Sequence, residues 1–305
     1  NKNVIVKNPK YASMNQIMYV SDYFNEMESA VYSKDGYSDT GKYYTEYLDL
    51  DSAVYKYISE EISYNIDADI SSTYFLKKSD NEGGQLLSLP LWDFDNAYGK
   101  LRLNFENAFH VSAGVTSFSD TRWYENLYNK PDFQKRVKEV YSEEYYPIIY
   151  NFYEYGIDET AMTLIPSIIM NDLRWTDKTC DNTDEIIPYY YLSIDYLKSF
   201  LGKRLAFLND AWINGTEYVN IYIQIDGDSQ YSRLSVPKGT TISQEILDRL
   251  YSYSYYGASV PRGLYYMEYT ELEDGKMYFV GNEVPFDPSL PLWEDIDLYY
   301  LWDSP

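Results

Sequence analysis

Four aspartates flank a pair of predicted strands, and they are the residues whose type and spacing could do chemistry. Asp67 and Asp69 lie just before the first strand, and Asp93 and Asp95 lie just after the second. If the strands form an antiparallel hairpin, its entry and exit ends are neighbours, so the four carboxylates would converge on one small site. Converging carboxylates stay ionised only beside a cation or a basic group. The sequence therefore predicts a site for a hard divalent ion, Mg²⁺ or Mn²⁺.

The order of these residues along the chain matches a phosphoryl-transfer site. In protein kinases a catalytic-loop Asp is followed five residues later by Asn, and a hairpin leads on to a metal-binding Asp. Here Asp67 is followed five residues later by Ser72, whose hydroxyl could replace the amide as a metal ligand. We predict that Asp67 is the base or substrate orienter, and that Asp93 binds metal together with Asp95 and Ser72. The alternative is that these are ordinary loop and cap residues of an acidic protein.

The elements that must position the hairpin are mainly helical. Ser13 and Gln16 form a predicted capping box, followed by one apolar helical stripe. A second helix is expected to start near Asp51, and others near Asp120, after Pro131, around residues 164–169 and, behind a capping box at Asn182, through residues 192–208. The two predicted strands are residues 73–78 and 85–91, joined by a polar loop at residues 80–84.

The hydrophobic pattern of the sequence changes from helix-like to strand-like near residue 216. From Tyr218 apolar residues alternate with polar ones, which is typical of a half-buried strand. Further strands are predicted at residues 232–236, 263–271, 276–280 and 296–302, with a short helix at 243–251. We therefore predict an α+β protein of two domains, residues 1–215 and 216–305, of which the second is small and β-rich.

Composition excludes several classes of function. The 305 residues contain 25 Lys and Arg against 48 Asp and Glu, a formal net charge of −23, which disfavours nucleic-acid and anionic-membrane partners. The single cysteine, Cys180, excludes an internal disulfide, and the single histidine, His110, excludes a multi-histidine zinc site and is expected to be an ordinary polar residue. No run approaches the roughly 18 apolar residues of a membrane span. The 38 tyrosines predict an amphipathic aromatic core and surface, or alternatively a carbohydrate-facing surface.

The segment around the hairpin resembles the CotH kinase family, the spore-coat protein H and its extracellular relatives. The strongest match is Leu91–Gly99 (LWDFDNAYG), with its tryptophan, its Asp-aromatic-Asp and its glycine. The resemblance spans roughly residues 10–212, and its other parts are YLDLDS (47–52), Asn65–Asp67 with STYF (72–75), WYENLYNKPDFQKRV (123–137), Arg174–Trp175 and YLKSFLGKRLAFL (196–208).

This resemblance implies an atypical kinase with a mostly helical C-lobe, in which Asp67 is catalytic and Asp93 binds metal and ATP, with Asp95 close by. The chain departs from the family pattern at Ser72, which stands where the family has Asn and is our other predicted contact of metal and ATP. It also implies ATP- and Mg²⁺- or Mn²⁺-dependent phosphorylation of serines in secreted or surface proteins, on the exterior of a bacterium. The nucleotide-binding lobe expected before residue 10 is not recognisable. We therefore expect a truncated or inactive form here, so whether the chain is an enzyme is left open.

The region 218–302 resembles the β-grasp repeats of internalin B type, also called Listeria–Bacteroides repeats. The matching residues are PKGTTI (237–242) and the closing stretch with Pro285, Leu292, EDIDLY (294–299) and Trp302. Such modules are implied to be stalks or adhesive spacers, so the alternative function is a non-catalytic surface scaffold that binds cell-wall or plant polysaccharide. Trp293, Trp302 and the tyrosines at 251–256 could form a glycan platform, or Trp302 could be core and 251–256 a helix end. A glycosidase would need two carboxyls at a fixed separation, which nothing here establishes.

Overall fold

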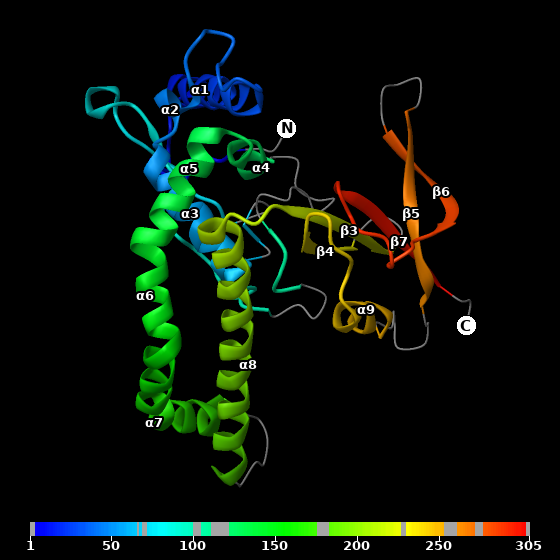
Figure 1. Cartoon of the computed structure of the whole chain (residues 1–305). Helices are drawn as coiled ribbons and strands as arrows, with labels where there is room; N and C mark the ends of the chain where they lie inside the picture. Colours follow the sequence, from blue (N-terminus) through cyan, green and yellow to red (C-terminus); the bar gives the residue numbers. More distant parts are fainter. Residues whose placement is uncertain are drawn as a thin grey trace.

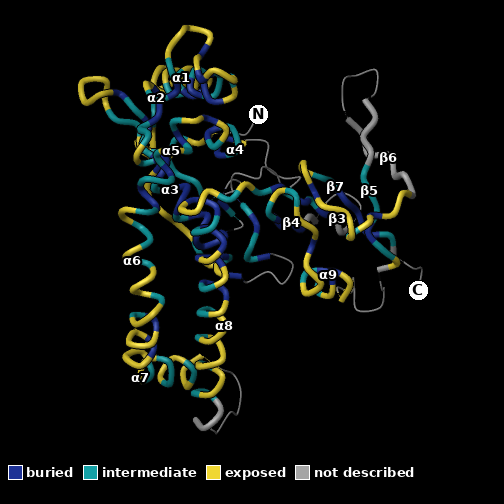
Figure 2. Tube along the Cα trace, viewed as in Figure 1, coloured by how far each residue is buried: buried dark blue, intermediate teal, exposed yellow. Residues whose placement is uncertain are grey.

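The computed structural model describes residues 4–65, 67–68, 72–99, 105–110, 122–175, 183–226, 230–252, 261–271 and 277–302. It is a mixed structure of helices and strands, in agreement with the predicted class. Figure 1 shows a helical body at one end, a long helical arm that leads away from it, and a sheet beside the body. Figure 2 shows that burial is concentrated in the body and in the centre of the sheet, whereas most of the arm is exposed.

The helical body is formed by α1 (Met14–Tyr32), α2 (Tyr44–Tyr47), α3 (Leu50–Ser63), α4 (Trp123–Tyr128) and α5 (Pro131–Val140). As Figure 1 shows, the arm is formed by α6 (Tyr146–Asn151), α7 (Ile157–Trp175) and α8 (Thr183–Asn209). The π-helical turns are η2 (Tyr141–Tyr145), η3 (Phe152–Gly156) and η4 (Asp210–Asn214). The predicted capping box is present, since Ser13 Oγ accepts from Gln16 N and Gln16 Oε1 accepts from Ser13 N. The Asn182 cap and Asp120 lie outside the described residues.

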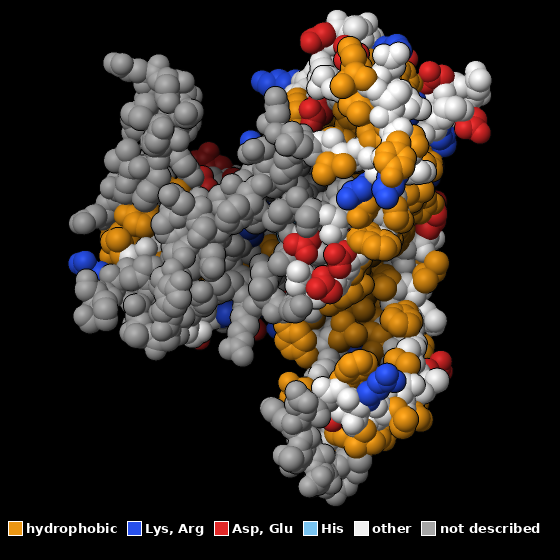
Figure 3. Space-filling model, turned by 180° about the vertical axis from the view of Figure 1, so that it is seen from behind, with side chains coloured by type: hydrophobic (Ala, Val, Ile, Leu, Met, Phe, Trp, Pro, Cys, Tyr) orange, Lys and Arg blue, Asp and Glu red, His pale blue; other side chains and the backbone are white. Residues whose placement is uncertain are grey.

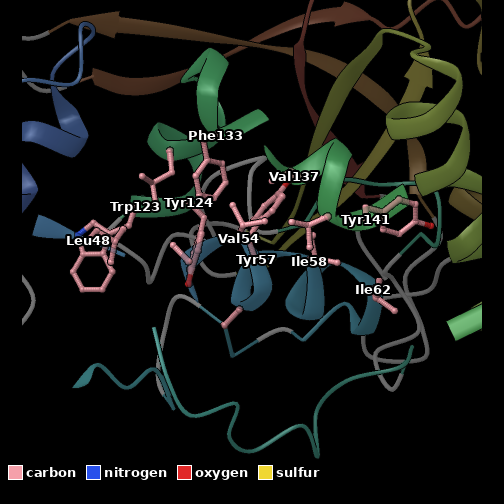
Figure 4. Close-up of a cluster of buried hydrophobic side chains, with 14 of the residues drawn as sticks. Leu48, Val54, Tyr57, Ile58, Ile62, Trp123, Tyr124, Phe133, Val137 and Tyr141 are labelled. Carbon is pink, nitrogen blue, oxygen red and sulfur yellow. The ribbon is translucent and has the colours of Figure 1, made fainter. Parts of the chain in front are cut away.

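Helix α3 is the central element of the body. Asp49 Oδ1 caps it by accepting from Ser52 N at 2.9 Å, an interaction that typically contributes about 1 kcal/mol. Its apolar side chains point toward α4 and α5, as Figure 4 shows for the cluster around Tyr57 and Phe133. The Tyr57 ring lies 5.9 Å from that of Tyr124 and 5.7 Å from that of Phe133, so tyrosine does build much of this core. This packing fixes the C-terminal end of α3, directly after which the residues of the candidate site begin.

The predicted hairpin exists, but its ladder is short. Strands β1 (Leu76–Lys77) and β2 (Leu86–Leu87) pair antiparallel with Leu76 opposite Leu87, and the 3₁₀ turn η1 (Asp80–Glu82) joins them. The predicted ranges 73–78 and 85–91 were too long. Pro90 lacks an N–H and cannot continue a ladder, while Leu48 bridges to Leu86 and occupies its other edge.

The predicted strands after residue 216 are all found. They form one sheet in the order β4–β3–β7–β5–β6, and α9 packs on it through Leu247 and Leu250. The first strand runs parallel to the last, with Ile221 opposite Ile296, and every other pairing is antiparallel. The bounds are β3 (Tyr218–Asp226), β4 (Gln230–Pro237), α9 (Gln244–Tyr251), β5 (Pro261–Glu271), β6 (Met277–Pro285) and β7 (Ile296–Trp302).

The segment 105–110, which we call the bridging segment, joins the two parts of the chain. Phe105 belongs to the buried cluster of the sheet, whereas Phe109 packs against Phe207 of the helical body with ring centroids 5.0 Å apart. Between them Asn107 O accepts from Ser235 N on the edge strand β4 at 2.8 Å. Apart from Phe105, the described residues of the sheet's cluster lie at 219–300, and those of the main helical cluster lie at 24–212. Two independent domains divided at 216 remain a prediction.

Candidate functional site

Asp67 lies just beyond the end of α3. Tyr64 ends that helix in the left-handed conformation with φ of 51°, and the buried Asn65 follows. The Asp67 backbone N–H donates to Asn65 Oδ1 at 3.2 Å, and Asn96 Nδ2 donates to Asp67 Oδ2 at 3.0 Å. The half-buried carboxylate is therefore oriented by an amide from the other end of the hairpin. Sequence reasoning missed Asn96, although it stands directly after the Asp-aromatic-Asp motif.

Ser72 and Asp93 meet from opposite ends of the hairpin. Ser72 Oγ donates to Asp93 Oδ2 at 3.2 Å across 21 residues of sequence. Both residues have positive φ, 55° for Ser72 and 64° for Asp93, a conformation that costs a non-glycine residue roughly 1–2 kcal/mol. Strained positions of this kind cluster at functional sites, where the surrounding structure holds them. The predicted approach of these two residues is thus present in the structure.

The predicted convergence of four carboxylates is not seen among the residues described. No group of three or more Asp, Glu, His or Cys side chains in this part of the chain lies close enough to hold one ion. Asp95 is exposed to solvent. Asp93 accepts a hydrogen bond from a hydroxyl and Asp67 accepts one from an amide, so neutral donors lie beside the latter two carboxylates. Asp69, the fourth member, lies outside the described residues.

A buried histidine supports the turn that carries Asp67. His110 Nε2 bonds the carbonyl oxygen of Asn65 at 2.5 Å, and its ring stacks on Tyr64 with centroids 4.3 Å apart. Burial, reinforced by Arg233 and Arg204, lowers the pKa of His110 to about 3, against its bond to Asn65. The imidazole is therefore neutral at ordinary pH and donates from Nε2. The sequence led us to expect an ordinary polar residue, which understates this structural role.

Arg204 of α8 connects three backbone segments behind the same turn. Its Nη2 lies 2.7 Å from Glu61 Oε2, and its Nε donates to Glu61 O at 2.6 Å. Its Nη1 donates to the carbonyls of Glu106, at 3.0 Å, and Ala108. His110 N also donates to Glu61 Oε2, at 2.9 Å. One fully buried guanidinium thus fixes α3 against α8 and the bridging segment.

The exit of the Asp93–Gly99 stretch is tied to the same helices. Tyr98 N donates to Ser63 O at 2.7 Å, and Tyr196 Oη of α8 bonds Gly99 O. Gly99 has φ of +81°, and a Cβ there would lie 2.7 Å from the Phe200 ring. Only glycine suits both that conformation and that space, so the final residue of LWDFDNAYG has a structural reason.

A second buried ion pair lies beside the aromatic residue of the Asp-aromatic-Asp motif. Lys56 and Glu60, one turn apart on α3, form it, and Lys56 Nζ is 5.9 Å from the centroid of the Phe94 ring. Burial raises the pKa of Glu60, while Lys56 and Asn65 act in the opposite direction. Nothing in the sequence distinguished these charges from those of a solvated helix face.

The polar side-chain atoms that meet at the two ends of the hairpin are all oxygen atoms, apart from the amide nitrogen of Asn96. Mg²⁺ prefers oxygen ligands, and in phosphoryl-transfer sites it takes one or two carboxylates together with substrate phosphates and waters. Asp93 with Ser72 is a donor set of that kind, and Asp67 is oriented separately from it. The arrangement could hold a divalent ion on one side and a hydroxyl-bearing substrate on the other.

Comparison with known proteins is informative at the level of the family. The family model described as CotH kinase protein matches residues 3–208, about two thirds of the chain. No significant match was found among the curated proteins or among the solved structures. The stretch that resembles an internalin-type repeat lies beyond the matched region. In the described part of the chain, every helix is too short or too polar to cross a membrane.

Proposed function

Because the chain belongs to the CotH kinase protein family, we propose that it is a metal-dependent protein kinase, which transfers the γ-phosphoryl group of ATP to a serine of a secreted or surface protein. The observation that carries the proposal is the meeting of the two ends of the hairpin. Ser72 contacts Asp93, and Asn96 contacts Asp67, across 21 and 29 residues.

In this mechanism Asp67 acts on the acceptor serine. Its carboxylate accepts the proton of the serine hydroxyl as the oxygen attacks phosphorus, which is the task of the catalytic Asp in kinases. Asn96 is a positioning residue, because its amide holds one carboxylate oxygen and leaves the carboxylate little freedom to rotate. The neutral His110 and the Arg204–Glu61 pair hold the backbone on which Asp67 stands.

Asp93 and Ser72, with Asp95 beside them, would hold Mg²⁺ or Mn²⁺ and through it the phosphates of ATP. The bound ion would neutralise charge on the phosphates and fix their orientation. The chain's own part is to present the ligands without rearrangement, which the positive φ of Ser72 and Asp93 and their mutual hydrogen bond favour.

The experiment is a thermal shift assay with Mn²⁺, with and without ATP, followed by transfer of ³²P from ATP to a serine-rich test protein. We expect Mn²⁺ with ATP to raise the melting temperature of the chain by mass action, and Asp93→Asn and Ser72→Ala to abolish that rise. Asp39→Asn, which removes an exposed carboxylate elsewhere, is the matched control. Binding without transfer would identify an inactive form, and no metal effect in any protein would overturn the metal-dependent kinase.

An adhesion protein is the second candidate, favoured by one observation on the sheet. Trp293 is largely exposed, and its ring lies over Gly239, where a Cβ would come within 2.8 Å of it. An exposed indole that packs on a glycine keeps a flat apolar face toward water, and such a face is suited to stacking on a sugar ring. Tyr251 is exposed too, whereas residues 253–256 and the Trp302 side chain lie outside the described part. Binding of cell-wall polysaccharide that is lost in Trp293→Ala and unchanged in Asp93→Asn would support this candidate.

The region 216–305 would then be a β-grasp-like module of a bacterial surface protein. The order β4–β3–β7–β5–β6, with the first and last strands parallel and α9 between β4 and β5 in sequence, supports this assignment. Limited proteolysis tests the predicted division of the chain. We expect cleavage near Gly215, which lies in the left-handed conformation between η4 and β3, to give two protected fragments that stay associated through the bridging segment. Cleavage spread evenly through the sheet would contradict it.

A further inference from the structure

Helix α7 is apolar on more than one side, yet little of it is covered. Residues 160–171 contain no charged side chain. Ala161, Ile165 and Ile168 form the stripe that is buried or half-buried, and Tyr190 of α8 bonds the carbonyl of Ala161. A second stripe, Met162, Met170 and Leu173, has the spacing of one helical face, and all three of its side chains are exposed. Thr160, Thr163, Ser167 and Asn171 form the polar stripe of the helix, so the second apolar stripe is uncovered although it is not part of the polar face.

Helix α8 repeats this pattern where it runs beside α7. Residues 186–194 contain no charged side chain either. Tyr189 and Leu192 lie three residues apart on one face, and they are 75% and 65% exposed. Figure 3 shows hydrophobic side chains gathered along the arm on the face turned toward the viewer. We use the name arm face for the apolar side chains of α7 and of the first part of α8 that are more than half exposed: Met162, Met170, Leu173, Trp175, Tyr189 and Leu192.

The arm face is large enough for a stable interface. Side chains of this size, exposed by more than half, each leave on the order of 100 Å² or more in water. Together the six would contribute on the order of 800 Å², which is about what each partner buries in a standard protein interface. Monomeric proteins rarely leave apolar patches larger than a few hundred Å² uncovered.

We propose that a second copy of this chain packs its arm face against this one about a two-fold axis. The chain carries a net charge of −23, yet the arm's two uncharged runs would meet without repulsion. The arm of another copy offers the same apolar surface, because a two-fold axis places the uncharged runs 160–171 and 186–194 of one copy against those of the other. A lipid surface is a poorer partner. Helices that lie in a membrane interface carry several Lys and Arg residues along their polar face, whereas Arg174 is the one basic residue among the described residues of 157–195.

Sedimentation velocity of the full chain, from sub-micromolar to tens of micromolar, tests this proposal. We expect a monomer–dimer equilibrium, and we expect Met170→Glu with Leu173→Glu to weaken it by at least about a hundredfold, because an unpaired charge cannot be buried cheaply. Both side chains are exposed in the single chain, so the fold should survive, which circular dichroism checks. The control is Leu76→Glu with Leu290→Glu, two equally exposed leucines outside the arm, which should leave the dimer intact.

A charge swap identifies the partner as the same face. Met170→Lys with Leu173→Lys should also be monomeric alone, but mixed with the glutamate variant it should form a heterodimer, because in a two-fold interface the patch meets itself. A chain that is monomeric at every concentration, a dimer unaffected by the arm substitutions, or a mixture that stays monomeric would overturn the proposal. So would a monomeric chain that binds neutral phosphatidylcholine vesicles through the arm.

Discussion

Two consecutive glutamates near the end of α3 are both fully buried and both paired with a base, but their surroundings differ. Glu61 receives the Arg204 guanidinium and the backbone N–H of His110 on its Oε2 atom. Glu60 has Lys56, one turn earlier on its own helix, against its Oε1 atom. Within the described residues, Glu60 Oε2 makes no hydrogen bond of good geometry, and the side chain of Asn65, which lowers the pKa of Glu60, is a further polar group beside this carboxylate.

The difference shows what a buried charge can contribute. Removing two charges from water is costly, and their attraction offsets this cost only when the remaining hydrogen-bonding capacity is also used. Arg204 uses its planar donors on the carbonyls of Glu61, Glu106 and Ala108 as well, so this pair connects distant segments. The Lys56–Glu60 pair connects two turns of one helix. We therefore expect the first pair to contribute much more to the stability of the fold than the second.

The largest effect is expected from Arg204→Met. The substitution leaves Glu61 buried without its counter-ion and three carbonyls without a donor, so the free energy of unfolding should fall by about 3–5 kcal/mol. Chemical denaturation measures it, with Lys203→Met, an exposed neighbour on the same helix, as the control. A loss below about 1 kcal/mol for Arg204→Met would remove the contrast between the two pairs.

The next effect concerns His110, which shares Glu61 with Arg204. Its pKa is lowered to about 3, so between pH 6.5 and 3 the unfolded chain binds a proton that the folded chain does not. Stability conferred by the neutral imidazole is thus lost as pH falls, by about 1.4 kcal/mol per unit, and His110→Gln should gain over the parent by that amount. The single histidine also gives one imidazole NMR signal, which should not titrate between pH 7 and 4. A midpoint near 6.5 would contradict the buried, neutral state.

A smaller loss is expected from Lys56→Met. It removes the counter-ion of Glu60, but a carboxyl whose pKa is already raised can take up a proton instead of remaining charged. We expect a loss of about 1–3 kcal/mol at pH 7 that shrinks as pH is lowered toward 5. Paired denaturation curves at the two pH values measure it, and Lys135→Met, at an exposed lysine on α5, is the control. A loss independent of pH would point to packing of the lysine stem alone.

The smallest effect is expected from Glu60→Gln. Because the folded pKa of Glu60 is raised, the parent loses stability as pH climbs above the unfolded value near 4.5, and the amide does not. The amide oxygen of the variant can still accept from Lys56 Nζ, although that ammonium loses its counter-ion, so the variant should lose about 1 kcal/mol at pH 5 and less than that at pH 8. Glu61→Gln, its neighbour, should be strongly destabilised at both pH values. Equal losses for the two amides would show that the comparison between Glu60 and Glu61 fails.

The parts of the fold that depend on local sequence pattern could be predicted from the sequence. Strand β3 and its successors were predictable because apolar residues alternate from Tyr218 onward, and α1 because Ser13 and Gln16 form a capping box. The meeting of Ser72 with Asp93 was predictable because antiparallel hairpins bring their ends together. The hairpin's few ladder pairs were not, since β-propensity does not register the effect of Pro90 or Leu48 on pairing.

The support behind the site could not be predicted, because its members are far apart in sequence and individually ordinary. Arg204 reaches Glu61 across 143 residues, and Asn96 reaches Asp67 across 29. Charges spaced like Lys56 and Glu60 occur on any solvated helix face, so only packing reveals that they are buried. The arm face was hidden for the opposite reason, because apolar stripes in α7 and α8 predict a core whether or not one chain supplies the other side.

The bridging segment has a consequence for how such proteins can be recombined. Phe105 fills the core of the sheet from more than a hundred residues upstream of it, and Asn107 exchanges hydrogen bonds with Ser235 on strand β4. A gene fusion that cuts at residue 216 would therefore separate the sheet from one of its own core side chains. If related proteins have exchanged the sheet region, the recipient should contain either a segment that matches residues 105–110 or an altered edge strand. The contact between the two parts of the chain therefore depends on two pieces of sequence that lie far apart.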